Sequence, residues 1–169
     1  MKRLNQEGFK LKKEKCEFFL TEITCLGHRV IEHGVLPTEE KVKAIQNAPT
    51  PRNASELKSF LGLVNFYGKF LPHFSTVLSP LNSLLQKNIA FKWQKQQDMA
   101  FKKVKDMLQS SDLLVHFNPE LPIVLSCDAL SVGLGSVLSH KMKDGSEKPI
   151  AYASRSLNKA EKNYSKERH

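Results

Sequence analysis

The spacing of apolar residues changes twice along the chain, and this change restricts the folds available to it. Residues 16–37, "CEFFLTEITCLGHRVIEHGVLP", are rich in strand-forming residues and contain a turn signal. Across residues 38–109 the apolar residues recur at the three- and four-residue spacing of amphipathic helices. Strand-like runs return in residues 113–157. This order predicts an α+β protein with two folding units and a boundary near residues 110–118.

The central region predicts four helices. The first begins after Thr38, a candidate N-cap, and ends before Pro49. The second begins at Asn53, and Glu56 three residues later completes a capping-box pattern. The other two are expected over residues 74–86 and 96–109. We interpret the apolar stripes of these helices as core packing.

The C-terminal region predicts antiparallel strands and the start of another helix. Strand-like runs include "LLVHF" at 113–117, followed by residues 121–130, 132–142 and 149–157. The sequence "KDGSEK" between the last two runs is typical of a turn. Asn158 and Glu161 repeat the capping-box spacing, so a helix is expected after the last strand.

Asp128 is the one carboxylate in the apolar and small-residue stretch "IVLSCDALSVGLGSVLS". A buried charge without partners is costly, so this residue calls for an explanation. Nucleases that use two metal ions need carboxylates that converge on Mg²⁺ ions roughly 3.5–4 Å apart. A phosphate-binding ATPase could also use an aspartate followed by glycines, although these usually lie closer together than Asp128 and Gly133. A turn cap at the strand end is the plain alternative. Gly133 and Gly135 would permit close approach of a backbone or a ligand.

The charge balance favours a polyanionic partner. Lys and Arg total 26 against 17 Asp and Glu, a net charge of +9. Such an excess suits nucleic acid, although a solvated lysine-rich surface gives the same balance. The lysines cluster twice, at Lys10, Lys12, Lys13 and Lys15, and at Lys102, Lys103 and Lys105.

Export and zinc binding are not indicated. The start, "MKRLNQEGFKLKKEK", lacks the apolar centre of a signal peptide, and no apolar run approaches the ~20 residues of a membrane span. We therefore expect an intracellular protein with no membrane partner. Cys16, Cys25 and Cys127 are too widely spaced for a zinc site, and we expect buried free thiols.

Four stretches, taken in order, carry a family resemblance. They are "LKKEKCEFF", "CLGHRVIEHGVLP", "PTPRNASELKSFLGLVNFYGKFLPHFS" and "CDALSVGLGSVLS" with "KPIAYASRSLNKAEKNYS". Together they resemble the reverse transcriptase–ribonuclease H region of the pol polyprotein of gypsy-type LTR retrotransposons. The match runs from about Leu4 to Ser165, and its length makes it far more specific than a single glycine motif.

The resemblance implies an α+β fold of four parts. Residues 1–37 resemble the end of the polymerase palm with the primer-grip hairpin, and residues 38–90 resemble the helical thumb. Residues 91–118 resemble a tether. Residues 119–169 resemble the truncated N-terminal part of a ribonuclease H-like α/β domain with three antiparallel strands.

The resemblance also implies binding residues and partners. Leu26, Gly27 and His28 would position the primer terminus, although an ordinary half-buried turn histidine is the alternative for His28. Lys12, Lys13 and Lys69 would contact nucleic acid. The implied partners are an RNA–DNA hybrid or a DNA duplex and the remainder of the pol polyprotein, in a cytoplasmic particle or the nucleus.

Asp128 matches the first metal-binding aspartate of the ribonuclease H site, which implies Mg²⁺ in the complete parent enzyme. The family's next carboxylate lies four residues after the tyrosine that matches Tyr164. Glu167 lies only three residues after it, and one helical position rotates a side chain by about 100°, so Glu167 is a weak match.

The polymerase double-aspartate motif does not occur in this sequence. We therefore expect a fragment of an RNA-directed DNA polymerase and ribonuclease H that binds primer–template duplex but neither polymerises nor cleaves alone. A non-catalytic nucleic-acid-binding module and the product of a decayed element are the alternatives.

Overall fold

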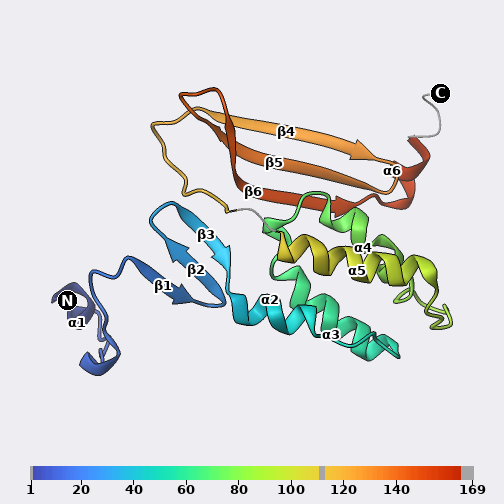
Figure 1. Ribbon diagram of the computed structural model, residues 1–169, viewed down its shortest axis with the longest axis horizontal. Helices are drawn as coiled ribbons and strands as arrows, with labels where there is room; N and C mark the ends of the chain where they lie inside the picture. The colour runs from blue at the N-terminus through green and yellow to red at the C-terminus, as the bar shows by residue number, and fades with distance from the viewer. Residues whose placement is uncertain (1, 111–112, 165–169) are drawn as a thin grey trace.

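The computed structural model describes residues 2–110 and 113–164 and has the strand–helix–strand order expected from the sequence (Figure 1). The elements are α1 (Lys2–Gln6), η1 (Lys13–Lys15), β1 (Glu22–Cys25), β2 (His28–Ile31), β3 (Gly34–Pro37), α2 (Glu39–Gln46), α3 (Ala54–Asn65), η2 (Gly68–Phe70), α4 (Phe74–Ser83), α5 (Lys95–Gln109), β4 (Ile123–Leu130), β5 (Gly133–Lys141), β6 (Glu147–Ser156) and α6 (Lys159–Tyr164). The strands form two three-stranded antiparallel sheets, so the α+β fold class is confirmed.

The first sheet has the order β1-β2-β3. Its first hairpin closes between the paired residues Cys25 and His28, so the turn consists of Leu26 and Gly27 alone. Both turn residues have positive φ, 48° and 76°. A two-residue turn of this kind needs a left-handed backbone at both positions, which favours glycine at one of them.

The helices α2 to α5 share one hydrophobic core, as their apolar stripes predicted. Fully buried side chains come from α2 (Ile45), α3 (Leu57), α4 (Leu81) and α5 (Val104). The third predicted helix ends earlier than expected, because α4 stops at Ser83. Figure 1 shows α4 and α5 side by side beneath the second sheet.

The helix caps are only partly as predicted. The backbone N–H of Glu56 donates to Asn53 Oδ1 at 2.9 Å, and the Glu56 carboxylate accepts from the Arg52 N–H at 2.8 Å, so the Asn53 cap is confirmed. Thr38 occupies the N-cap position of α2, but its side chain makes no capping hydrogen bond.

Lys105 does not extend the exposed cluster of Lys102 and Lys103. Its Nζ donates to the carbonyl oxygens of Gln46 and Ala48 at 2.9 and 2.6 Å, and it lies 4.3 Å from the centre of the Phe101 ring. Burial lowers the pKa of Lys105. This lysine therefore satisfies the free carbonyl groups at the end of α2 and fixes α5 against it.

The second sheet has the order β4-β5-β6, and α4 covers one face of it over β5 and β6. The backbone N–H of Ser75 in α4 donates to Ser154 Oγ in β6 at 2.9 Å. The strand β4 lies beyond this cover, and most of its residues are exposed. The helices and the second sheet are therefore packed together.

The expected strand at 113–117 is wrong. Leu114 forms only an isolated bridge with Val35 of β3, through N–H···O distances of 2.8 and 3.1 Å. The next residue, Val115, donates its N–H to the Pro149 carbonyl at 2.9 Å. Because consecutive residues pair with different sheets, this segment joins the two sheets and extends neither.

Two further expectations concern membranes and cysteines. Within residues 2–110 and 113–164, no helix has the length and apolar character needed to cross a bilayer. All three cysteines are free, but the prediction that they are buried is wrong, since Cys25 and Cys127 are exposed and Cys16 is half-buried. Cys25 lies on β1 and Cys127 on β4, two strands whose residues are largely exposed.

Candidate nucleic-acid interface and carboxylate site

The Leu26–Gly27 turn is held by two helical elements. The Gly27 carbonyl accepts a hydrogen bond from the Thr38 N–H, at the start of α2, and another from the Tyr67 hydroxyl, both at 3.2 Å. A Cβ atom at position 27 would lie 2.9 Å from the Tyr67 hydroxyl oxygen. The turn therefore requires glycine for space as well as for φ, and it leaves Leu26 84% exposed at its tip.

His28 lies beside this turn among aromatic rings. Its ring centre is 4.9 Å from that of Phe66, 5.9 Å from Tyr67 and 5.7 Å from Phe70. Nδ1 lies 3.1 Å from the Leu26 carbonyl oxygen, which can only accept, so Nδ1 carries the proton. The buried Nε2 atom has no hydrogen-bond partner.

The electrostatics of His28 favour its neutral form. Burial lowers its pKa most, and the positive charge of Lys69 lowers it further. The hydrogen bond to the Leu26 carbonyl raises the pKa and opposes both effects. Lys69 lies in η2 with its Nζ 5.3 Å from the centre of the Phe70 ring, and its side chain is exposed.

The structure thus brings together four of the predicted binding residues, Leu26, Gly27, His28 and Lys69. It also adds Phe66, which sequence reasoning missed. Phe66 is 50% exposed and lies against both His28 and Tyr67. The sequence offered one clue to Phe66: this aromatic residue directly follows α3 and does not continue the apolar stripe that packs into the core. We call these five residues the turn cluster.

Lys12 and Lys13 are not part of the turn cluster. They lie at η1, in the N-terminal segment before β1, and both are exposed. Figure 1 shows this segment apart from the helical elements, on the opposite side of the first sheet.

Asp128 lies on β4, and its position follows from the strand register. It pairs with Gly135 of β5, and Gly135 pairs with Ser154 of β6. Directly opposed residues project from the same face of a sheet. Because Ser154 Oγ contacts α4, Asp128 lies on the same face as that helix but beyond its cover. Asp128 is exposed, so the burial cost inferred from its apolar neighbours does not arise.

A cavity of about 230 Å³ lies beside Asp128. It is lined by Asp128, Ser126, Val137 and Tyr152 of the sheet and by Pro72 and His73, which precede α4. A Cβ atom at Gly135 would lie 2.7 Å from Nδ1 of His73, and one at Gly133 would lie 2.8 Å from Thr76 Oγ1. The close approach predicted at these glycines is therefore made by the first turn of α4 and the residue before it.

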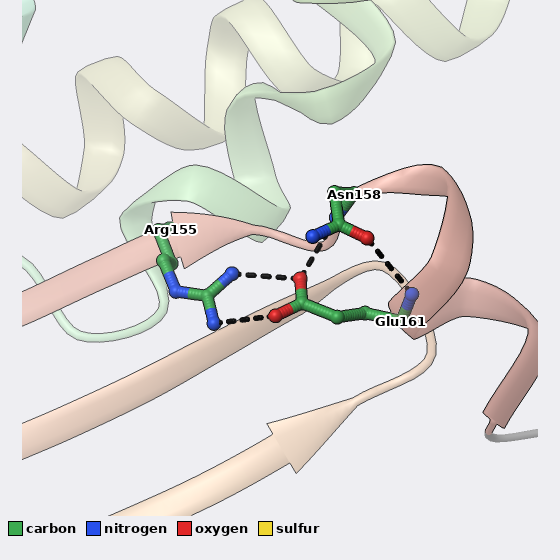
Figure 2. Close-up of polar contacts among 3 residues, drawn as sticks. All are labelled: Arg155, Asn158 and Glu161. Carbon is green, nitrogen blue, oxygen red and sulfur yellow. Dashed lines mark hydrogen bonds and ion pairs between the residues drawn. The ribbon is translucent and has the colours of Figure 1, made fainter.

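Glu161 is the nearest carboxylate after β6 in the chain, but it is already bound (Figure 2). The Arg155 guanidinium donates to both of its oxygens, at 2.8 and 2.7 Å, and the Asn158 N–H donates to Oε2 at 2.9 Å. The Glu161 N–H donates to Asn158 Oδ1 at 2.9 Å, which confirms the predicted cap. These bonds, above all those from Arg155, lower the pKa of Glu161 to about 2.

The residues that line this cavity provide one carboxylate for a metal ion, that of Asp128. Glu167 lies outside them, and within residues 2–110 and 113–164 no group of three or more His, Cys, Asp or Glu side chains could hold an ion. The Asp128 carboxylate can contribute one ligand to a hard cation such as Mg²⁺, which is commonly bound by one or two carboxylates and keeps several of its waters. Glu161 is occupied by Arg155 and cannot complete the site as it stands.

Comparisons with known proteins agree with this architecture. Residues 93–169 match the family of RNase H-like domains found in reverse transcriptase. More than four fifths of the chain resembles solved structures of the foamy viral protease-reverse transcriptase. The one in complex with dsDNA gives a TM-score of 0.72 and 31% identity over 85% of this chain and 30% of that chain. The structure in complex with RNA/DNA hybrid gives a TM-score of 0.69 and 32% identity, and the match covers 83% of this chain and 19% of that chain. The fold is thus similar to part of these reverse transcriptase structures, and the C-terminal part of the chain matches an RNase H-like domain.

The curated relatives of this chain include retrotransposon polyproteins. The chain is 35% identical over 165 residues to the Transposon Tf2-3 polyprotein of Schizosaccharomyces pombe and, at the same identity, to the Tf2-4 polyprotein. The match covers 98% of this chain, which spans 12% of the length of those relatives. The chain is homologous to a region of retrotransposon polyproteins, and residues 93–169 carry its match to the RNase H-like domains found in reverse transcriptase.

Proposed function

We propose that this chain grips a primer–template duplex as part of a retrotransposon reverse transcriptase. In this proposal residues 1–37 are the end of the palm, residues 38–90 the thumb, residues 91–118 the tether and residues 119–169 the first part of the ribonuclease H domain. The tether contributes α5 to the core of the thumb. Relatives of known structure support the proposal, because the foamy viral protein was solved with dsDNA and with an RNA/DNA hybrid.

The observation that carries the proposal is the composition of the turn cluster. Leu26 and Phe66 expose apolar surface beside the cation of Lys69. Exposed aromatic and aliphatic side chains contact sugars and bases, whereas lysine contacts phosphates. The neutral His28 completes the apolar part and adds no charge there.

The proposal is tested by the fluorescence anisotropy of a labelled RNA–DNA hybrid and of a DNA duplex, titrated with the full chain at several salt concentrations. Affinity should fall steeply with salt and depend little on sequence. Lys69→Gln should weaken binding, since one phosphate contact is lost. The slope of log K against the logarithm of the salt concentration should become shallower by about 1. Lys143→Gln removes the same charge from the exposed turn between β5 and β6 and serves as the control. Equal effects of the two variants, or binding that does not respond to salt, would contradict the proposal.

We propose in addition that Asp128 is the first carboxylate of a ribonuclease H site and holds a hydrated Mg²⁺ ion. When bound, such an ion stabilises the negative charge that develops at a phosphate. Because Glu161 is bound to Arg155, the chain alone should bind a hybrid without cutting it. This favours a non-catalytic binding module as the second candidate function. Mg²⁺-dependent cleavage of a hybrid by the purified chain, abolished by Asp128→Asn, would contradict that expectation.

The remainder of the polyprotein is the other proposed partner. Phe9, Phe18 and Phe19 in the N-terminal segment are 62%, 60% and 105% exposed. Exposed apolar surface of this size commonly contributes to a protein interface. Lys12 and Lys13 lie between these phenylalanines, and we propose that they contact nucleic acid at the edge of that interface.

A further inference from the structure

We propose that His140 is a pH-sensitive latch on the connection between α5 and β4. Its neutral ring holds residues 117–122, which we call the latch segment, against the end of β5, and proton uptake by the ring releases them. The proposal concerns the conformation of the chain and depends neither on duplex binding nor on an ion at Asp128.

The first observation is that one buried ring bonds the latch segment at two points. His140 is the last residue but one of β5, and only 1% of its surface is exposed. The Asn118 N–H donates to Nε2 at 2.9 Å, and Nδ1 lies 3.3 Å from the Pro122 carbonyl oxygen. A single side chain of the second sheet therefore satisfies backbone groups near both ends of the segment.

The second observation is that these two bonds define the protonation state of the ring. A carbonyl oxygen can only accept, so Nδ1 carries the proton, and a backbone N–H can only donate, so Nε2 carries none. Both nitrogens of a protonated imidazole are donors. A second proton on Nε2 of His140 would therefore point at the Asn118 N–H, and this hydrogen bond would be lost. The closed latch accommodates only the neutral ring.

Charged groups face His140 from the neighbouring elements. Lys148 of β6 lies opposite it in the strand register, and Lys141 follows it in β5. Glu120 belongs to the latch segment, and β4 contributes the uncharged Ile123. The side chains of the two lysines and of Glu120 are exposed, whereas both nitrogens of the buried ring are bonded to the latch segment. The charge state of the ring is thus coupled most directly to that segment.

Two further contacts of the latch segment involve the same ring and the same carbonyl. The Phe117 ring stacks on His140 with the ring centres 5.6 Å apart, although Phe117 is 57% exposed. The Lys141 N–H donates to the Pro122 carbonyl at 3.0 Å. Movement of the segment away from the ring would therefore break these contacts together with the two bonds to His140.

The residues before the latch segment are held by other groups. The Val115 N–H donates to the Pro149 carbonyl at 2.9 Å, and His116 Nε2 lies 2.8 Å from the Ile31 carbonyl oxygen. The helix α4 packs against β5 and β6 of the second sheet. Opening of the latch should therefore free residues 117–122 and leave the two sheets in place.

The test measures amide hydrogen exchange of the full chain by NMR between about pH 8 and pH 5, the range in which histidines commonly change charge. An opening that takes up one proton should become up to about tenfold more frequent for each pH unit. We expect the protection factors of the Asn118 and Lys141 amides, corrected for intrinsic exchange, to fall in this way. The Val115 amide is the reference and should keep its protection. Long-range ¹H–¹⁵N spectra of the His140 ring should show the second proton on Nε2 as protection falls.

Two substitutions identify the group that titrates. His140→Gln offers one acceptor and one donor in place of the two nitrogens and carries no titrating group, so the Asn118 amide should stay protected over the whole range. His116→Gln is the matched control, since it removes the histidine next to the latch segment. The Nε2 atom of His116 donates to a carbonyl, a bond that a protonated ring can keep, so the pH response of Asn118 should persist in this variant.

An Asn118 protection factor that does not change with pH would overturn the proposal, and so would an equal fall in the unmodified chain and in His140→Gln. A simultaneous fall at Val115 would show that acid opens the connection as a whole, which contradicts a local latch. If His140→Gln does not fold, the ring spectra of the unmodified chain decide. A doubly protonated His140 beside a still protected Asn118 amide would overturn the proposal.

Discussion

The Tyr67 hydroxyl donates a hydrogen bond to the Gly27 carbonyl at 3.2 Å, across 40 residues of sequence. Tyr67 is almost fully buried, and the same carbonyl accepts from the Thr38 N–H. The turn that carries Leu26 is thus fixed by the end of α3 and the start of α2. Its orientation is a property of the helical core, although the turn itself belongs to the first sheet.

Gly27→Ala should destabilise the chain more than Gly145→Ala. Both glycines have positive φ, +76° and +83°, so alanine strains the backbone similarly at each. A Cβ at Gly145 meets nothing within 4 Å, whereas one at Gly27 lies 2.9 Å from the Tyr67 hydroxyl. We expect Gly27→Ala to lower the free energy of unfolding by about 1–3 kcal/mol beyond the control, measured by urea denaturation. An equal loss of stability in Gly27→Ala and Gly145→Ala would show that the Tyr67 side chain moves away from the added Cβ without a cost in free energy.

Lys69→Gln should raise the pKa of His28 without restoring its ordinary value of 6.5, because burial is the larger cause of the shift. Since the folded pKa is lowered, the unfolded chain binds this proton first as pH falls below 6.5, and stability decreases through that window. An NMR titration of the His28 ring in both proteins checks the shift. Lys143→Gln should leave the titration unchanged, and an identical pKa in Lys69→Gln would exclude the charge effect.

Local patterns predicted two of the three expected helix caps, and Thr38 was the exception. Asn53 with Glu56 and Asn158 with Glu161 form the expected bonds, because the cap and its partner are three residues apart and need nothing else. The segment 113–117 was wrong because its composition favours a strand, while its backbone groups are taken by two different sheets.

The candidate site was less predictable. Leu26, Gly27 and His28 are contiguous, and their binding role was predicted from the family resemblance of that stretch. Phe66 joins them only through the fold. Lys105 lies in a lysine run on an amphipathic helix, and no local pattern reports that its amine reaches the carbonyl groups of α2.

The pairing of His73 with Gly135 was likewise invisible in the sequence, and a double-mutant cycle measures it. Gly135→Ala should lower the free energy of unfolding by about 1–3 kcal/mol, because its Cβ would lie 2.7 Å from Nδ1 of His73. In the His73→Gly background the same change should cost less, with a coupling energy of about 0.5–3 kcal/mol. Gly62→Ala is the control, since its Cβ meets nothing within 4 Å on α3 and should stabilise by up to about 1 kcal/mol. Additive effects of the first two changes would contradict the contact.

The attachment of α6 to β6 should fail in acid. The pKa of Glu161 is lowered from 4.5 to about 2, first by the Arg155 hydrogen bonds and then by the Asn158 N–H. Because the folded pKa is below the unfolded one, this carboxylate stabilises the chain above pH 4.5, and its contribution is lost as pH falls from there towards 2. A carboxyl ¹³C NMR titration of Glu161, read together with its capped amide, measures the midpoint. Arg155→Lys keeps the charge but loses the two-pronged contact, so its midpoint should lie between those values. A midpoint near 4.5 in the unmodified chain would show that the contact of Figure 2 does not hold α6 in solution.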